Sequence, residues 1–351
     1  MHMSTGIKFF LTRIVRYEFW PFWLFYLPMY FYGLYLALRA GSFTYFTAAN
    51  PGMKYGGAFD MLKFDILTRI NPDYTPRGIR IPHDSSTYDL RALITAAGLD
   101  FPMVVKPDIG ERGKGVELVV DLHGLQAYLA AQKGNIILQE YISYPMELGV
   151  LYYKYPDGSA EEVTSVVIRD FLKVRGDGKR TLRSLMKENI RVQLNRKYLH
   201  RKYQDRLDEI IPEGEEILLE PIGNHNRGTC FLDGNQLIND QMLSVFSGIA
   251  SDIPGFDYGR FDIKVKDLED LYRGKGISIL ELNGVNSEPA HIYDPDYRLL
   301  QAYRDITRHM KIIYRISRMN HKEGIPYASF SMFTVDLKNH LYPRQRKKTL
   351  S

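Results

Sequence analysis

Two short segments near the middle of the second half of the chain carry polar side chains at a spacing that suits metal binding. Residues 259–265 and 277–283 alternate apolar and polar positions, as β-strands with one buried face do. The polar positions that share a face are Arg260 and Asp262 in the first strand and Glu281 and Asn283 in the second. If the strands pair, three oxygen donors converge beside an arginine, which suits Mg²⁺ completed by substrate phosphates. An exposed hairpin face is the alternative reading.

A lysine followed by a glycine-rich loop lies earlier in the chain. Residues 101–105 read as a buried strand that ends at Lys106, and Gly110, Gly113 and Gly115 follow. Glycines reach positive φ and let main-chain N–H groups close around phosphate oxygens, while the lysine adds a positive charge. Since ordinary hairpins also combine a lysine with a glycine turn, the loop alone does not identify nucleotide binding.

A third element combines an apolar strand with a nearby carboxylate. Residues 136–142 form the strand, and Glu147 follows a proline after it. The backbone of such a strand could pair with a purine edge while Glu147 accepts hydrogen bonds from ribose hydroxyls. A buried strand with a solvated glutamate is the alternative.

The order of these parts resembles the ATP-grasp superfamily, in particular the D-alanine–D-alanine ligase group, over about residues 60–310. The segment 169–179 is similar to one in cyanophycin-synthetase-type ligases. The resemblance implies an α/β (α+β) protein in which two α+β subdomains grip ATP. It also implies a domain order of an aromatic segment at 1–60, an ATP-grasp domain at 61–320 and a basic tail at 321–351.

The resemblance assigns nucleotide contacts to five residues. The lysine that matches Lys106 contacts the α- and β-phosphates, and an earlier lysine, matched by Lys63, joins the phosphate site. The glutamate that matches Glu140 and the backbone near Ile142 contact adenine. The one that matches Glu147 binds the ribose.

The resemblance also implies how phosphate is transferred. The loop 110–115 covers the phosphates, and Asp262, Glu281 and Asn283 match the ligands of two Mg²⁺ ions, for which Mn²⁺ can substitute. Arg260 matches the arginine that stabilises the transferred phosphoryl group. These roles are expectations carried over from the family.

The loop directly after Asn283 should face the acceptor substrate. It spans residues 284–291 and contains Ser287 and His291, which we expect to contact substrate. A lone loop histidine is more often structural, so the assignment of His291 has a plain alternative.

The chain departs from the family before residue 60, where ATP-grasp ligases carry a full α/β domain that binds part of the acceptor. About sixty residues fall below the usual size of a domain with its own core. In their place residues 19–38 form an uncharged run rich in Phe, Tyr and Trp. The acceptor specificity of the family therefore does not carry over to this chain.

The run 19–38 is long enough to cross a bilayer, but two features oppose a simple span. Pro21 and Pro28 interrupt it. The basic residues that precede it are Lys8, Arg13 and Arg16. They should stay on the cytoplasmic side, where the ATP site must also lie. A re-entrant or interfacial element satisfies both conditions, and an aromatic helix buried on the enzyme or in a homodimer is the alternative.

Composition indicates the cellular compartment and the kinds of partner that we expect for the protein. The single cysteine, Cys230, excludes an internal disulfide and suits a reducing compartment. Part of the net charge of +5 lies at the C-terminus, in Arg344, Arg346, Lys347 and Lys348, where it could meet anionic lipid headgroups. We see no nucleic-acid-binding module and no zinc-ligand spacing. We expect a cytoplasmic protein, or one attached to the cytoplasmic face of the inner membrane.

The sequence therefore predicts an ATP- and Mg²⁺-dependent ligase that activates a carboxylate as an acyl phosphate for attack by an amine or similar nucleophile. Its substrates would be small or amphiphilic. A kinase on the same scaffold, acting on a small or lipid-like acceptor, is the alternative enzyme. A membrane-docking protein that uses nucleotide only as a switch is the third reading, which the intact set around Asp262 disfavours.

Overall fold

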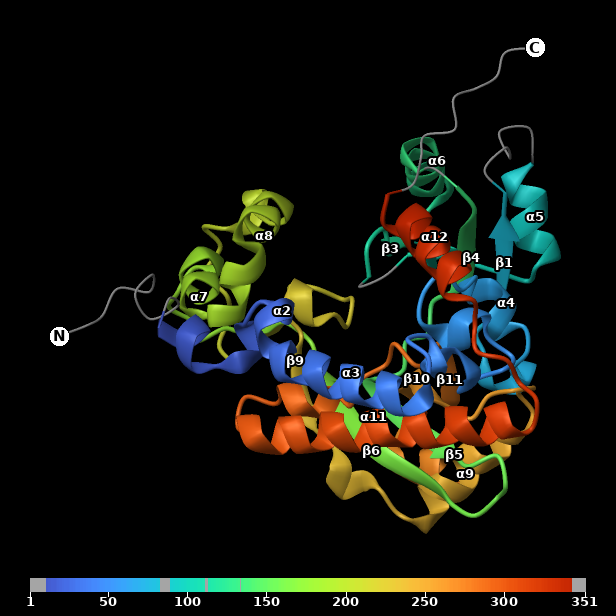
Figure 1. Cartoon of the computed structure of the whole chain (residues 1–351). Coiled ribbons are helices and arrows are strands. Elements are labelled where there is room, and N and C mark those ends of the chain that lie inside the picture. The colour runs from blue at the N-terminus through green and yellow to red at the C-terminus, as the bar shows by residue number, and fades with distance from the viewer. Residues whose placement is uncertain (1–10, 83–88, 111–112, 133, 343–351) are drawn as a thin grey trace.

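The computed structural model describes residues 11–82, 89–110, 113–132 and 134–342. The predicted contributions of Lys8, of loop residues Glu111 and Arg112 and of the basic residues after 342 lie outside these ranges. The described chain forms a mixed α/β structure (Figure 1), and its strands make three antiparallel sheets.

The first sheet contains Lys106. Its strands are β1 (Gly78–Ile81), β2 (Met103–Pro107), β3 (Glu117–Val119) and β4 (Ile136–Glu140), in the order β1-β4-β2-β3. Met103 and Val105 of β2 pack with residues of α5 (Leu90–Ala96) and α6 (Leu122–Ala131). Because side chains alternate along a strand, Val104 and Lys106 point to the opposite face, which lines a cavity.

The second sheet contains the predicted metal ligands. Its strands are β5 (Met146–Lys154), β6 (Glu161–Asp170), β9 (Cys230–Asp233), β10 (Tyr258–Val265) and β11 (Ile277–Asn283), in the order β11-β10-β5-β6-β9. The strands expected at 259–265 and 277–283 are confirmed, and they pair antiparallel as the metal-site prediction requires. The expected turn between them contains the short helix α10 (Leu268–Tyr272).

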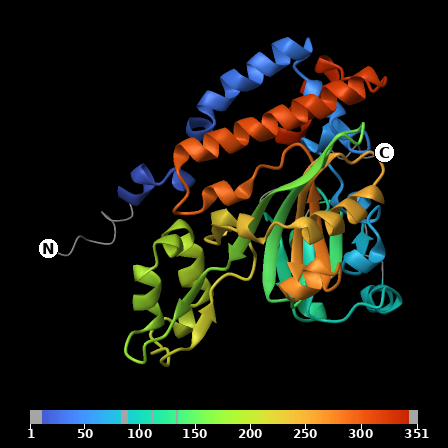
Figure 2. The same cartoon turned by 90° about the horizontal axis from the view of Figure 1, so that it is seen from below.

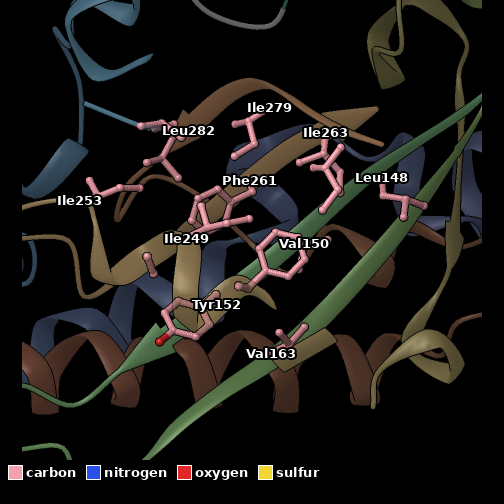
Figure 3. Close-up of a cluster of buried hydrophobic side chains, with 14 of the residues drawn as sticks. Leu148, Val150, Tyr152, Val163, Ile249, Ile253, Phe261, Ile263, Ile279 and Leu282 are labelled. Carbon is pink, nitrogen blue, oxygen red and sulfur yellow. The ribbon is translucent and has the colours of Figure 1, made fainter. Parts of the chain in front are cut away.

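One face of the second sheet forms the largest apolar core. Val150 and Tyr152 of β5 and Phe261 of β10 pack there with Ile249 and Ile253, from α9 (Asp240–Ser251) and the turn after it (Figure 3). Full burial of one such side chain contributes roughly 1.5–3 kcal/mol. This core holds β10 in register, so Arg260, Asp262 and Lys264 alternate onto the other face.

The opposite face of the sheet meets the long helix α11 (Leu299–Lys322). Leu151 and Tyr153 of β5 and Tyr258 of β10 contact its Ile312 and Ile316. The helix α3 (Leu27–Ala40) lies along α11 on the side away from the sheet, as both views show (Figures 1 and 2). The aromatic segment predicted as residues 19–38 therefore forms an outer layer over α11.

Local sequence explains how this aromatic segment is broken. Pro21 precedes the short α2 (Phe22–Phe25), and Pro28 lies in the first turn of α3. Backbone N–H groups in the first turn of a helix have no acceptor within the helix, so the N–H that proline lacks costs no hydrogen bond there. Gly41 ends α3 with φ 69°. Within the described residues, no helix is long and apolar enough to cross a membrane.

A small lobe and a C-terminal helix complete the fold. The lobe consists of β7 (Lys173–Arg175), β8 (Glu216–Leu218), α7 (Leu182–Glu188) and α8 (Arg196–Lys202) around its own apolar cluster. The last helix, α12 (Phe330–Leu341), lies in the region predicted as a tail and packs Phe333 against Tyr55 and Phe59.

Short segments connect these parts. Among them are α4 (Lys63–Leu67) and the 3₁₀ turns η1 (Tyr17–Phe19), η2 (Tyr45–Ala48), η3 (Lys54–Gly57), η4 (Pro72–Tyr74), η6 (Ile190–Asn195), η7 (Gln204–Arg206), η8 (His225–Arg227), η9 (Asn235–Leu237) and η10 (Ala290–Tyr293).

Candidate active site

A cavity of about 1180 Å³ is bounded by both large sheets and by α3 and α11. Ligand pockets usually span about 300–1,000 Å³, so this one has room for a nucleotide and a second ligand. Most of the predicted site residues line it: Lys63, Lys106, Gly110, Gly113, Glu140, Ile142, Glu147, Arg260, Asp262, Glu281, Asn283 and Ser287. Segments that are far apart in the sequence therefore meet at one site.

The predicted metal donors lie on one face of the β10–β11 pair. Asp262 is directly opposite Glu281, and Arg260 is opposite Asn283. Directly opposite residues of an antiparallel pair have their Cβ atoms about 4.5–5.5 Å apart, on the same side of the sheet. Asn283 Nδ2 lies 3.5 Å from Asp262 Oδ2, which completes a compact set of two carboxylates and an amide.

Two arginines hold the carboxylate of Asp262. Arg260 Nε lies 2.6 Å from Oδ1, and Arg169 of β6 places its NH2 group 2.7 Å from Oδ2. Burial by itself would raise the pKa of Asp262, but these two charges outweigh burial and lower the pKa to about 2. Asp262 is therefore ionised at any physiological pH.

The lysines approach the same place from the other sheet and from α4. Lys63 Nζ lies 3.0 Å from Glu281 Oε1. Lys106 Nζ donates to Gln139 Oε1 at 2.9 Å and to the carbonyl of Leu280 at 3.0 Å. Burial lowers the pKa of Lys106 to about 8, although the charge of Glu281 opposes that shift.

The residues expected to bind the nucleoside lie along one side of the cavity. Glu140 ends β4, where Arg77 Nε lies 3.2 Å from its Oε2. The carbonyl of Ile142 accepts a hydrogen bond of 2.8 Å from Lys264 Nζ. Glu147 is buried on β5, and Arg169 NH1 lies 2.6 Å from its Oε1. Arg169 thus links the predicted ribose ligand to the predicted metal ligand Asp262.

The glycine loop adopts backbone angles that favour glycine. Gly113 and Gly115 have φ of 66° and 70°, in the left-handed region. The carbonyl of Gly113 accepts a hydrogen bond of 2.9 Å from Arg227, which ties the loop to η8. Gly110 and Gly113 line the cavity, whereas Gly115 lies where the hairpin returns and accepts from the Tyr128 hydroxyl at 2.6 Å.

The loop after β11 places its two expected substrate residues differently. Ser287 lines the cavity, with its hydroxyl bonded to the carbonyl of Gly284. His291 is 2 % exposed and is not among the residues that line the cavity. Its Nδ1 lies 2.7 Å from the Ser165 hydroxyl and its Nε2 3.2 Å from the Tyr297 hydroxyl. Both ring nitrogens thus have partners inside the core, and the structure does not bring His291 to the cavity with the other expected site residues.

The donor set fits magnesium on chemical grounds. Asp262, Glu281 and Asn283 offer hard oxygen atoms, too few for an all-protein cage but suitable when phosphates complete the coordination. Within the described residues, no three or more His, Cys, Asp or Glu side chains form a metal-binding group. A Mg²⁺ ion bound to Asp262 and Glu281 would take the side-chain oxygen of Asn283 as its third protein donor.

Several residues of the site were not predicted. Lys264 follows Arg260 and Asp262 at period two on β10, so the strand pattern could have identified it. Arg169 and Gln139 carry no such signal, because their contacts depend on how β6 and β4 are placed in their sheets. Glu288 accepts hydrogen bonds from the hydroxyls of Tyr26 and Tyr293, which connects the acceptor loop to the aromatic segment.

Comparison with known proteins gives a match to one segment of the chain. Residues 75–149 match the model of the RimK-like ATP-grasp domain, a stretch that includes Lys106, the glycine loop, Glu140 and Glu147. A comparison with curated proteins found no match.

Solved structures give more distant likenesses. The chain is similar to the VanG D-Ala:D-Ser ligase from Enterococcus faecalis, with a TM-score of 0.42 and 12% identity, over 76% of this chain and 64% of that one. It is similar to a D-alanine–D-alanine ligase from Bacillus anthracis, with a TM-score of 0.41 and 14% identity, over 74% and 67% of the two chains. It is also similar to a bifunctional glutathione synthetase from Pasteurella multocida, with a TM-score of 0.37 and 14% identity, over 74% of this chain and 38% of that one. The chain thus spans less than two thirds of the first and third of these proteins. Residues 75–149 are therefore similar to the RimK-like ATP-grasp domain.

Proposed function

We propose that this protein is an ATP-dependent ligase that activates a carboxylate as an acyl phosphate and transfers the acyl group to an amine or similar nucleophile. One observation carries the proposal. Three cationic side chains and three oxygen donors converge on one wall of a cavity that continues to the loop of Ser287. They are Lys63, Lys106, Arg260, Asp262, Glu281 and Asn283. Such a wall suits phosphoryl transfer to a neighbouring acceptor.

The proposed reaction has two steps. A carboxylate oxygen of the acceptor attacks the γ-phosphorus of ATP, and the bond to the β-phosphate oxygen breaks, so ADP leaves. The amine then attacks the carbonyl carbon of the acyl phosphate, the carbon–oxygen bond to phosphate breaks, and the amine releases one proton. No covalent bond to the protein is needed.

The side chains contribute charge and position. Lys63, Lys106 and Arg260 neutralise the charge that spreads over the moving phosphoryl group, and their contacts hold them in place before ATP binds. Arg169 holds Asp262 and Glu147 at a fixed spacing. When Mg²⁺ is bound by Asp262, Glu281 and Asn283, it supplies further positive charge to the phosphate oxygens.

The nucleoside contacts stay proposals. We propose that Glu147 binds the ribose and that the backbone at Ile142, with Glu140, contacts adenine, since all three line the same side of the cavity. Because ATP is the substrate and Cys230 suits a reducing compartment, we place the activity in the cytoplasm.

Trapping with hydroxylamine tests the proposal. The protein, MgATP and a pooled extract of cell metabolites and lipids are incubated with hydroxylamine, which converts acyl phosphates to hydroxamates. We expect ATP-dependent hydroxamates from the native protein and none from Arg260→Ala. The exposed-surface variant Leu300→Ala should behave as the native protein. ADP formed together with a stable phosphorylated product, and no hydroxamate, would instead identify a kinase.

A further inference from the structure

The helix α3 carries apolar or aromatic side chains on every side, and its only charged residue is Arg39 in the last turn. One side, with Leu36 and Ala40, is buried in an apolar cluster that includes Tyr314 of α11. The next side lines the cavity and consists of Tyr26 just before the helix and Met29, Tyr30, Gly33, Leu34 and Ala37. The third faces outward and carries Leu27, Phe31, Tyr35 and Leu38, which are 45%, 68%, 49% and 67% exposed. A helix with apolar side chains on all sides is normally buried. The exposed outward side of α3 therefore indicates contact with a further apolar environment.

The half of the cavity under α3 differs from the phosphate half. Ile306, Met310 and Ile313 of α11 line it opposite the α3 residues, and Phe46 and Phe59 border it. A Cβ atom at Gly33 would lie 3.2 Å from Met310 Cε, so glycine lets the two helices approach closely. Because most of these side chains are apolar, this half can accept a chain of apolar atoms, although His309 and Glu288 also line the cavity.

The apolar half of the cavity opens onto the outward aromatic surface. Phe22, Tyr30 and Leu34 line the cavity, and they are also 51%, 51% and 45% exposed. Phe43, 59% exposed, lines it as well and contacts Phe330 of α12, with 5.9 Å between the ring centroids. An apolar chain could therefore pass from the surface of α2 and α3 into the cavity without crossing a polar rim.

We propose that the acceptor substrate is an amphiphile whose apolar chain lies between α3 and α11, and that it enters from an anionic lipid surface on which α2 and α3 rest. The reaction assigned to this substrate rests on the proposed function. Figure 2 shows α3 at the edge of the molecule, beyond α11, where such a surface has access.

The charges around this face favour lipid over a second copy of the chain. Arg39 is exposed at the end of α3, and Arg13 is exposed before its other end. Between residues 19 and 43 there is no acidic residue, and the only charge is Arg39. A two-fold pairing of this face would bring like charges together in either orientation. Anionic lipid headgroups complement the positive charges of Arg13 and Arg39. They would do so with α3 lying at the depth in the lipid that is typical of an interfacial helix.

Vesicle flotation tests the docking surface. The full-length protein is mixed with vesicles of phosphatidylcholine and phosphatidylglycerol at a ratio of about three to one, and the bound fraction is measured. We expect the native protein to float with the vesicles. The double variant Phe31→Glu/Leu38→Glu, at two positions that do not line the cavity, should bind at least about tenfold more weakly. Leu300→Glu, 80% exposed on α11, is the matched control and should bind as the native protein does.

Either of two results would overturn the assignment of α2 and α3 as a lipid-binding surface. Absence of flotation by the native protein, or equal flotation of the double variant, contradicts it. If light scattering then shows a native dimer that the double variant converts to monomer, the face is an interface between two copies. Unchanged binding of an ATP analogue by the double variant shows that the ATP site is intact.

A fluorescent amphiphile tests the chain site separately. The probe is 11-(dansylamino)undecanoic acid, whose emission rises in an apolar site. Ala37→Phe fills the cavity beside α11 and should weaken probe binding by about tenfold or more, while Leu300→Phe should not. Equal probe binding by Ala37→Phe contradicts the assignment. If the native protein did not bind the ATP analogue, that result would contradict the proposed function instead. The failure of the chain site and the failure of the proposed function are therefore distinguishable.

Discussion

The two ends of the cavity are built by different means. The end that we propose for phosphate is a charged strand surface on which both carboxylates have counter-charges: Asp262 has Arg260 and Arg169, and Glu281 has Lys63. The other end is a helix pair, α3 on α11, that contributes mostly apolar side chains. The first end is suited to a defined, highly charged ligand, and the second to a ligand defined mainly by its apolar surface.

The helices of the second end also differ from each other. The outer positions of α11 carry Arg304, Arg308 and Arg315, all exposed, as expected for a helix that faces water. The outer positions of α3 carry Phe31 and Leu38, although the helix lies at the edge of the molecule. The difference indicates that α3, and not α11, meets a further apolar partner.

The largest expected effect concerns the phosphate end. Glu281→Ala removes a carboxylate that would serve Mg²⁺ and that holds Lys63, so turnover of ATP should fall by about a thousandfold, or roughly 4 kcal/mol. Assays of ADP release measure the effect, and circular dichroism checks the fold. Glu269→Ala, at a largely exposed glutamate of α10, should leave turnover unchanged. Turnover near the native rate in folded Glu281→Ala would remove the metal role of this residue.

The next effect concerns how the aromatic segment is held. Glu18 is buried, and its Oε2 lies 2.6 Å from Arg191 Nη2 and 3.2 Å from His225 Nε2. These contacts join η1 to η6 and η8. Glu18→Ala leaves Arg191 buried without its carboxylate and should lower the free energy of unfolding by about 3–5 kcal/mol. Urea denaturation measures this, with Glu162→Ala, a half-exposed glutamate, as the control. A loss no larger than in the control would contradict this anchoring role.

The same contact predicts a dependence on pH. Burial would raise the pKa of Glu18, but the hydrogen bond from His225 and the charge of Arg191 lower it below the ordinary value. The stabilisation is therefore present above the ordinary carboxyl pKa and is lost as pH falls through the lowered value. Native protein should lose stability on acidification more than Glu18→Ala does.

These contacts show how far the sequence could predict the structure. Period-two alternation was sufficient to place Arg260, Asp262, Glu281 and Asn283 on one strand face, because strand geometry is local. The position of His291 in the core could not be predicted, because its partners Ser165 and Asp305 come from distant parts of the chain. A local pattern says which residues share a face, but not which distant side chains that face meets.

The aromatic segment shows the same limit. Its apolar character and its prolines were visible in the sequence, and the position of Pro28 in the first turn of α3 follows from backbone chemistry. The tertiary fold decides which side of α3 packs near α11, which side lines the cavity and which side faces outward. Arg169 likewise joins Glu147 and Asp262 only because β6, β5 and β10 are neighbours in the sheet.

A smaller effect separates nucleotide binding from chemistry. Glu147→Ala should weaken ATP binding by about tenfold while the saturated rate changes less, because a ribose contact is similar in the ground and transition states. Equilibrium binding of an ATP analogue measures the first and steady-state kinetics the second. An unchanged dissociation constant would show that Glu147 serves only to hold Arg169.

The smallest effect concerns Lys106. Because burial lowers its pKa to about 8, the lysine loses its charge as pH rises through that value, and phosphate binding must then restore the proton. ATP affinity should fall by about fourfold between pH 7 and 8.5. Lys106→Met should bind more weakly at both pH values, with a smaller change between them. A native affinity that is independent of pH would contradict the placement of phosphate beside Lys106.

The central claim is that the strand face of Asp262 and Glu281 binds ATP together with magnesium, and calorimetric titration with a non-hydrolysable ATP analogue tests it most directly. The native protein should bind the analogue at least about tenfold more tightly with Mg²⁺ than without it. Glu281→Gln, which keeps the side-chain shape, should retain metal-free binding but lose most of the gain from Mg²⁺. Native binding that does not depend on Mg²⁺, or an undiminished gain in Glu281→Gln, would contradict the account.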